Sequence, residues 1–235
     1  MRNALGRAIL FLLGLVLVGG SSHAIADSDR TKKPAIQGSQ TARKGALSSE
    51  EKLYLLSLAR ETLTQYLKEG KTTEGVSEKA PSNLKEKRGC FVTLKKNGDL
   101  RGCIGFILPM KPVCDCVVEN VINAAIHDTR FPAPVSAEEL NSITIEISVL
   151  TVPEKLELRD HSELLSRLAP GRDGVILKNR WYQSTYLPQV WEDLPDKEEF
   201  LDSLCRKGGM PVGCWKDENT EIFTYQAEVF REQKP

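Results

Sequence analysis

The segment LRGCIG, residues 100–105, holds the clearest candidate for chemistry in this chain. Cys103 lies between Gly102 and Gly105, whose missing side chains would let a ligand approach the backbone. A guanidinium as near as that of Arg101 would favour the thiolate, which is the nucleophilic form of a cysteine. Cys103 is therefore a candidate nucleophile or ligand contact, with Arg101, Gly102 and Gly105 as candidate ligand-binding residues. The alternative is a small, buried, apolar cysteine beside a β-bulge.

Three further polar residues could take part in the same chemistry. Arg130 could present its guanidinium to an anionic ligand, or it could pair with a nearby acid. His127 precedes Asp128 and is a candidate for proton transfer; alternatively it ends a helix, where the terminal carbonyls favour a cation. Glu146 alternates with an apolar strand face, so it is a proton-transfer candidate if it lines a cleft and a solvated residue if it does not.

No metal site is predicted. Cys114 and Cys116 are two residues apart, and on a helix such positions point about 200° apart, so both thiols cannot close one small site unless the helix begins after them. The sequence also contains no paired zinc-type cysteine spacing, phosphate loop, hydrolase nucleophile elbow or dinucleotide fingerprint. These motifs therefore identify neither a cofactor, which stays unknown, nor a reaction.

One disulfide is predicted. The six cysteines are an even number, which an oxidising compartment permits to pair. Cys205 and Cys214 flank the turn Gly208–Pro211, which could bring their Cα atoms within bridging distance. The alternative is two free thiols held apart by an extended proline segment.

The candidate thiol is expected on a β-hairpin. Asn97 and Gly98 both tolerate positive φ, and as a pair they are typical of a two-residue type I′ turn. Counting outward from this turn places Cys103 opposite Val92. Cys90 would then lie on the same face of the hairpin as Cys103, which leaves a disulfide between these two cysteines open as a further alternative.

The remaining elements predict an α+β fold, with a mixed, largely antiparallel sheet flanked by helices. Capping boxes and apolar periodicity predict helices and strands. Helices are expected over residues 48–70, 112–127, 160–168 and 196–204, and Ser136 with Glu139 marks another short helix. Strands are expected over 90–94, 100–108, 143–149, 174–178, 181–187 and 221–230. Residues 70–87 lack a period and are expected to form a loop.

The N-terminus predicts export. Arg2 and Arg7 precede an uncharged apolar run over residues 8–20, and an Ala-x-Ala step ends at Ala26, which is the layout of a signal peptide cleaved before Asp27. The run is too short to span a bilayer, so the mature chain is expected in the periplasm or secreted, without stable membrane insertion. An uncleaved N-terminal anchor is the alternative. Residues 27–45 are polar and read as a flexible linker, and residues 46–233 as the folded domain.

The balanced charge argues against nucleic acid held by bulk electrostatics, because 32 basic residues oppose 32 acidic ones. The hydrophobic fraction of 40% over 235 residues suits a globular protein of about one domain.

Several motifs in fixed order resemble the AmmeMemoRadiSam system protein A family, whose members carry an AMMECR-type domain. They are LRGCIG at 100–105, DTRFP at 128–132, IEISVLT at 145–151, GRDG at 171–174, LPQV at 187–190 and the stretch 205–215. The resemblance covers about residues 48–230. It implies an α+β domain with a mixed sheet and a smaller subdomain. It also implies an association with Memo-like and radical S-adenosylmethionine proteins, but no established reaction. The family usually has proline where this chain has Thr129, and export would separate the chain from iron–sulfur enzymes that need a reducing compartment.

Two classes of function follow. The first is a small-ligand-binding or enzyme-like domain with a cleft at the LRGCIG hairpin. The second is a non-catalytic module that docks a Memo-like partner through an exposed strand and proline-rich turns. The two differ in whether Arg101, Cys103, His127, Arg130 and Glu146 converge on one pocket.

Overall fold

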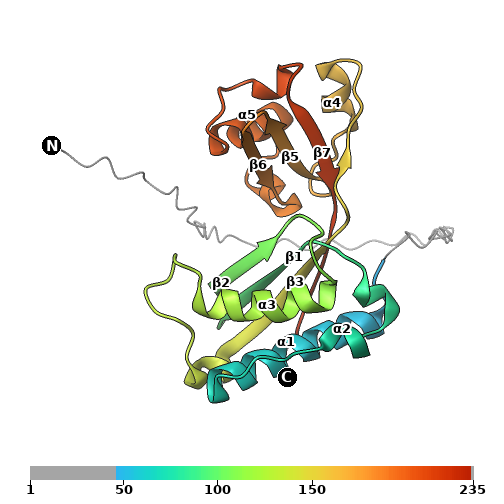
Figure 1. The fold of residues 1–235 in the computed structure, drawn as a ribbon. Helices are drawn as coiled ribbons and strands as arrows, with labels where there is room; N and C mark the ends of the chain where they lie inside the picture. Colours follow the sequence, from blue (N-terminus) through green and yellow to red (C-terminus); the bar gives the residue numbers. More distant parts are fainter. Residues whose placement is uncertain (1–45, 234–235) are drawn as a thin grey trace, which may run out of the picture. The chain divides into compact units, whose positions relative to one another are not determined.

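The structure is a computed structural model that describes residues 46–233 (Figure 1). The predicted signal peptide, its cleavage site at Ala26 and Asp27, and the predicted linker all lie outside the described residues. Within residues 46–233, no helix is long and apolar enough to span a membrane. These residues form two lobes, each built on a four-stranded sheet.

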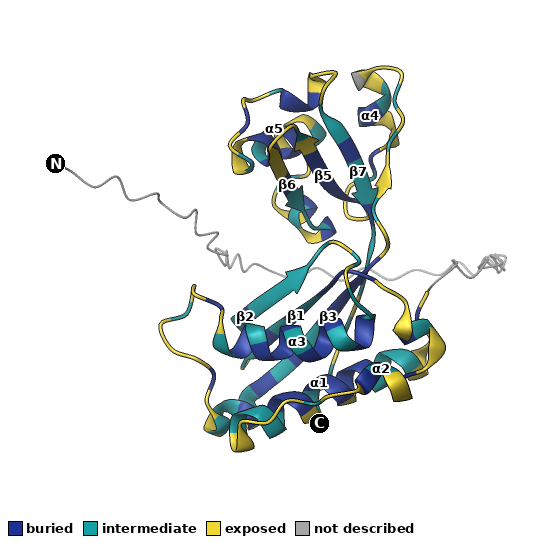
Figure 2. Ribbon diagram, in the orientation of Figure 1, coloured by how far each residue is buried: buried dark blue, intermediate teal, exposed yellow. Residues whose placement is uncertain are grey.

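The first lobe is a sheet covered by helices on one face. Its strands, in order across the sheet, are β2 (Asp99–Phe106), β1 (Cys90–Lys96), β3 (Ile143–Leu150) and β8 (Ala227–Arg231). α3 (Val113–Ile126) packs on β1 and β2, whereas α1 (Ser49–Glu69) packs on β3 and α3 (Figures 1 and 2). Alternate residues of each strand face the helices, and at these positions the side chains are mainly aliphatic. The core between sheet and helices includes Leu55, Leu63, Val92, Leu94, Val117, Val121, Ile145 and Ile147.

The helix-start signals operate as the sequence predicts. Ser48 caps α1 in a reciprocal capping box with Glu51, and Gly70 ends the helix in the left-handed conformation at φ 68°. Ser136 and Glu139 form a second capping box, but the helix that follows is the short 3-10 helix η2 (Ala137–Ser142).

The segment expected as a loop over residues 70–87 contains two short helices. These are α2 (Val76–Lys79) and the 3-10 helix η1 (Ser82–Lys85), each of four residues. Four residues are too few for an apolar period to show, so the sequence pattern could not reveal them. Val76 and Leu84 are buried in the first core.

The second lobe has a more aromatic core. Its strands, in order, are β4 (Glu154–Lys155), β7 (Glu221–Tyr225), β5 (Gly174–Asn179) and β6 (Tyr182–Tyr186). Its helices are α4 (His161–Arg167), α5 (Lys197–Lys207), η3 (Pro188–Glu192) and η4 (Cys214–Lys216). The rings of Trp191 and Phe200 stack with centroids 3.6 Å apart, which brings η3 against α5.

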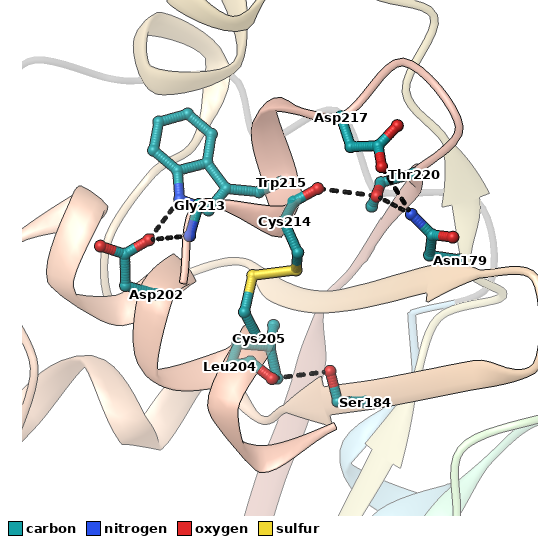
Figure 3. Close-up of a disulfide and its surroundings, with 10 residues drawn as sticks. All are labelled: Asn179, Ser184, Asp202, Leu204, Cys205, Gly213, Cys214, Trp215, Asp217 and Thr220. Carbon is teal, nitrogen blue, oxygen red and sulfur yellow. Dashed lines mark hydrogen bonds between the residues drawn. A yellow bond between two sulfur atoms is a disulfide. The ribbon is translucent and has the colours of Figure 1, made fainter. Parts of the chain in front are cut away.

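A disulfide between Cys205 and Cys214 joins α5 to η4 (Figure 3). The carboxylate of Asp202 supports the same turn, because it accepts hydrogen bonds from the backbone N–H of Gly213 at 2.9 Å and from Trp215 Nε1 at 2.8 Å. The chain between the two cysteines therefore reverses at the glycine-rich turn.

The prediction of a single strand over residues 221–230 is wrong. It is two strands, β7 and β8, which belong to different sheets and are separated by Gln226. An apolar run gives no sign of where one sheet ends and another begins. The α+β prediction is confirmed, with two sheets in which every strand pair of the described residues is antiparallel.

Candidate functional site

A β-bulge in the LRGCIG hairpin decides where the candidate residues point. The turn is the predicted one, with Asn97 at φ 54° and Gly98 at φ 101°. Beyond it the pairing shifts: Lys95 is opposite Leu100, but Leu94 is opposite Gly102. Arg101 is therefore the extra residue of β2, and each later residue of β2 is displaced by one position.

The prediction that Cys103 faces Val92 is wrong because of this bulge. Cys103 is opposite Thr93, and Val92 is opposite Ile104. Opposite residues share a face, so Cys103 lies on the face of the sheet away from α3, whereas Cys90 is fully buried with Val92 under the helices. A disulfide between Cys90 and Cys103 is therefore excluded in this fold, because their side chains lie on opposite faces of the sheet.

The backbone of Cys103 is held by an ion pair from the loop after α3. The Asp128 carboxylate accepts a hydrogen bond from the Cys103 N–H at 2.8 Å, and Arg130 donates to the Cys103 carbonyl at 3.1 Å. Asp128 and Arg130 also pair with each other at 2.6 Å. β2 is an edge strand, so this arrangement, called here the Asp128–Arg130 clamp, satisfies backbone groups that would otherwise be unpaired at the edge.

The clamp affects the ionisation of both partners. Hydrogen bonds from Arg130 and from the Cys103 N–H hold the pKa of Asp128 below its ordinary value. The pKa of Arg130 is raised by the same contact with Asp128. Asp128 is 8% exposed, so a charged carboxylate at this position depends on these partners.

Arg101 is fixed on the other side of the strand. Its guanidinium donates to both carboxylate oxygens of Glu139 at 3.0 Å, and to the carbonyls of Ala133 and Pro134 at 3.1 and 2.9 Å. The Phe131 ring lies 5.6 Å from the guanidinium carbon. Hydrogen bonds from Arg101 contribute most to lowering the pKa of Glu139 to about 2.

A pocket of about 280 Å³ opens beside Arg101, between the end of α3 and the loop that follows it. Its polar lining includes Arg101, His127, Asp128 and Thr129. Its apolar lining is formed by alanine, isoleucine, phenylalanine and proline side chains, namely Ala124, Ala125, Ile126, Phe131, Pro132, Ala133 and Pro134. His127 is exposed and ends α3, as one of the two interpretations of this residue predicted.

The remaining candidates lie on the open face of the sheet. Thr93 Oγ1 lies 3.2 Å from Cys103 Sγ, and on its other side Thr93 is opposite Glu146. Glu146 pairs with Lys95 at 3.0 Å. Cys103, Thr93 and Glu146 thus form one row across three strands, and this row does not contribute to the lining of the pocket beside Arg101.

The two glycines are packed against neighbours and do not leave the backbone open to a ligand. A Cβ on Gly102 would lie 2.0 Å from the carbonyl oxygen of Ala124 in α3. A Cβ on Gly105 would lie 2.3 Å from the carbonyl oxygen of Cys90 and 2.4 Å from the ring of Phe91. Gly102 is therefore required for close packing of β2 on α3, and Gly105 for close packing within the hairpin.

Sequence reasoning missed Glu139 and Thr93. Glu139 carried a visible signal as the acidic member of a capping box, but that motif explains only its contact with Ser136. The residues 46–233 contain no group of three or more His, Cys, Asp or Glu side chains suited to hold a metal ion.

Comparisons with known proteins agree on one family. The AMMECR1 family model matches residues 56–230. A protein of Methanothermobacter thermautotrophicus is 41% identical over 187 residues, covering 79% of this chain and 96% of its own, and one of Methanopyrus kandleri is 44% identical over 193 residues, covering 80% and 92%. The crystal structure of an uncharacterized protein from Pyrococcus horikoshii aligns with a TM-score of 0.72 at 39% identity, covering 80% of this chain and 95% of that one. The chain belongs to the AMMECR1 family.

Proposed function

We propose that this domain binds a small anionic ligand in the pocket beside Arg101. The observation that carries the proposal is that the Arg101 guanidinium is held in place by hydrogen bonds that do not use all of its donors. Its Nε and Nη2 donate hydrogen bonds to Glu139 and to two carbonyls, while its other terminal nitrogen, Nη1, has no acceptor among residues 46–233. A guanidinium held in place in this way binds a carboxylate or phosphate with little further loss of entropy.

Charge around the pocket supports an anion. Two carboxylates, Glu139 and Asp128, are opposed by three cations, which are Lys96, Arg101 and Arg130. His127 lines the pocket and can supply a further positive charge or a proton. The volume of about 280 Å³ suits a ligand of a few heavy atoms.

The proposal assigns binding to the pocket and does not route a covalent step through Cys103. Arg101 and His127 line the pocket, whereas Cys103 and Glu146 lie on the open face of the sheet. Arg130 contributes through the clamp, which fixes the hairpin strand that carries Arg101. A reaction at Cys103 would need a second ligand-binding surface on the open face.

Isothermal titration with inorganic phosphate and with short-chain dicarboxylates tests the proposal. We expect saturable binding to the wild type, weakened at least tenfold in Arg101→Lys, because a lysine has one terminal nitrogen, which cannot hold Glu139 and also contact a ligand. Lys95→Gln is the matched control, since it removes a cation from the open face of the neighbouring strand. Binding lost in Lys95→Gln and retained in Arg101→Lys would contradict the proposal and favour the open face.

A second candidate function is docking of a partner, for which the family resemblance suggests a Memo-like protein. The supporting observation is the tip of the β5–β6 hairpin, where Trp181 is 95% exposed and Tyr182 is 54% exposed. β6 is an edge strand, and exposed aromatic residues are common anchors of interfaces. Trp181→Ala should weaken binding of a purified Memo-like protein by at least tenfold if this function holds; equal binding by the variant and the wild type would reject it.

We further propose export with cleavage between Ala26 and Asp27, supported by the charged, apolar and Ala-x-Ala regions of residues 1–26. The pairing of Cys205 with Cys214 suits an oxidising compartment. The intact mass of protein from an exporting host should correspond to a chain that starts at Asp27, and a full-length mass would reject cleavage.

A further inference from the structure

Cys90 and Cys116 meet in the core of the first lobe. Cys90 begins β1 on the face covered by helices, and Cys116 lies in the first turn of α3. Both are buried, at 0% and 1% exposure. Their sulfur atoms are 2.6 Å apart, which is closer than the roughly 3.5–4.0 Å at which even non-bonded carbon atoms rest. The separation exceeds an S–S bond by only roughly half an ångström.

A third residue supports the same interpretation. Asn120 lies one helical turn after Cys116 and directs its Nδ2 to Cys116 Sγ at 3.3 Å and to Cys90 Sγ at 3.9 Å. Asn120 is fully buried, and its Oδ1 has no partner among the described residues. A thiol would supply an S–H to that oxygen, whereas the sulfurs of a disulfide only accept hydrogen bonds. The amide orientation therefore matches a disulfide better than two thiols.

We propose that Cys90 and Cys116 form a second disulfide, which links β1 to α3 directly behind the LRGCIG hairpin. The other two cysteines would stay free. Cys103 lies on the opposite face of the sheet, and Cys114, two residues before Cys116 on the helix, points elsewhere in the core. This inference does not depend on the ligand pocket.

The oxidation balances by exchange with a disulfide-bearing oxidant, either a small molecule such as glutathione disulfide or a protein disulfide. The Cys116 thiolate attacks one sulfur of the oxidant, breaks its S–S bond and releases one thiol. The Cys90 thiolate then attacks the Cys116 sulfur of this mixed disulfide and releases the second thiol. The pair loses two electrons, and the oxidant takes up both electrons and the two protons. Because both sulfurs are buried in the native fold, the reaction belongs to folding rather than to the folded protein.

Oxidative refolding in vitro tests the pairing without reference to where the protein resides. The reduced, unfolded chain is refolded in a glutathione redox buffer, unfolded again without reductant and alkylated with iodoacetamide. Trypsin together with cleavage before aspartate then places Cys90 in residues 89–95, Cys116 in 115–127, and Cys103 with Cys114 in 102–114. The expected product is peptide 89–95 joined to 115–127, lighter by two hydrogen atoms than the free pair. Recovery of both peptides alkylated, or of 89–95 joined to 102–114, would overturn the proposal.

A stability measurement provides the second readout. The difference in Tm between oxidised and reduced protein should shrink by about 6–12 °C in Cys116→Ala, because the loop between the two cysteines is no longer closed. Cys114→Ala is the matched control, since it removes a buried thiol from the same helical turn and should retain the full difference. Equal oxidised–reduced differences in the wild type and both variants would reject the bridge.

Discussion

The two faces of strand β2 differ in how their polar side chains are held. On the side of α3, Arg101 is bonded to Glu139 and to two backbone carbonyls beside a pocket. On the open side, the Cys103 side chain has Thr93 as a neighbour and is half-buried. Residues two apart on a regular strand share a face, so it is the bulge at Arg101 that separates the two. One extra residue therefore separates two nearby residues of the motif. Arg101 lies beside the pocket, and Cys103 lies in a half-buried row on the open face of the sheet.

The largest effect is expected from filling the space between β2 and α3. Gly102→Ala would place a Cβ 2.0 Å from the carbonyl oxygen of Ala124, and backbone cannot yield as a flexible side chain can. We expect a loss of about 3 kcal/mol or more of unfolding free energy in urea denaturation, together with loss of the pocket. Leu100→Ala, at an exposed position of the same strand, should cost less than about 1 kcal/mol. Similar costs for both variants would show that the hairpin does not depend on its contact with α3.

A smaller effect is expected from breaking the Asp128–Arg130 clamp. Asp128→Asn keeps the shape but removes the charge that Arg130 and the Cys103 N–H stabilise. We expect a cost of about 1–3 kcal/mol. In a double-mutant cycle, Arg130→Gln should cost little more once Asp128 is already replaced. Additive costs would indicate that the two side chains act independently.

Acid should lower the stability of the folded protein by protonating Glu139, the partner of Arg101 beside the pocket. Its pKa in the folded protein is about 2, below the ordinary 4.5, so it stabilises the fold at any pH above 4.5 and that contribution is lost as the pH falls from 4.5 toward 2. Urea denaturation across this range should therefore show a fall in stability that is smaller in Glu139→Gln. Parallel pH profiles for the variant and the wild type would contradict the Arg101–Glu139 contact.

The smallest effect is expected on the open face. Cys103→Ser changes little volume at a half-buried position beside the Thr93 hydroxyl, so it should cost less than about 1 kcal/mol. In the folded protein Cys103 should react with iodoacetamide faster than the fully buried Cys90 and Cys114. If alkylation of Cys103 required denaturation and Cys103→Ser lowered Tm by several degrees, the residue would belong to the core.

Local signals in the sequence predicted most of the fold. The capping boxes at Ser48 and Ser136 and the turn at Asn97–Gly98 act over a few residues, so they can be read directly. A β-bulge beside Cys103 was one of the two alternatives, but its place at Arg101 could not be read from local spacing, because β2 packs at Gly102 against Ala124, which lies more than twenty residues later. The prediction of one strand over residues 221–230 failed for a similar reason, because tertiary contacts decide which strands pair and hence that this segment is shared by two sheets.

The candidate site was predictable in its residues but not in its geometry. Residue types identified Arg101, His127 and Arg130 as polar groups near the hairpin, but their partners come from other elements. Glu139 reaches Arg101 from η2, and Asp128 reaches Cys103 from the loop after α3. No spacing rule relates these positions, so their roles become visible only in the folded chain.

The most direct test of the anion-binding pocket is a backbone-amide NMR titration with inorganic phosphate. Saturable chemical-shift changes should occur at Arg101, His127 and Thr129, which line the pocket, and should be absent at Thr93 and Glu146 on the open face. Changes confined to the open face, or no saturable change in either region, would contradict the proposed site.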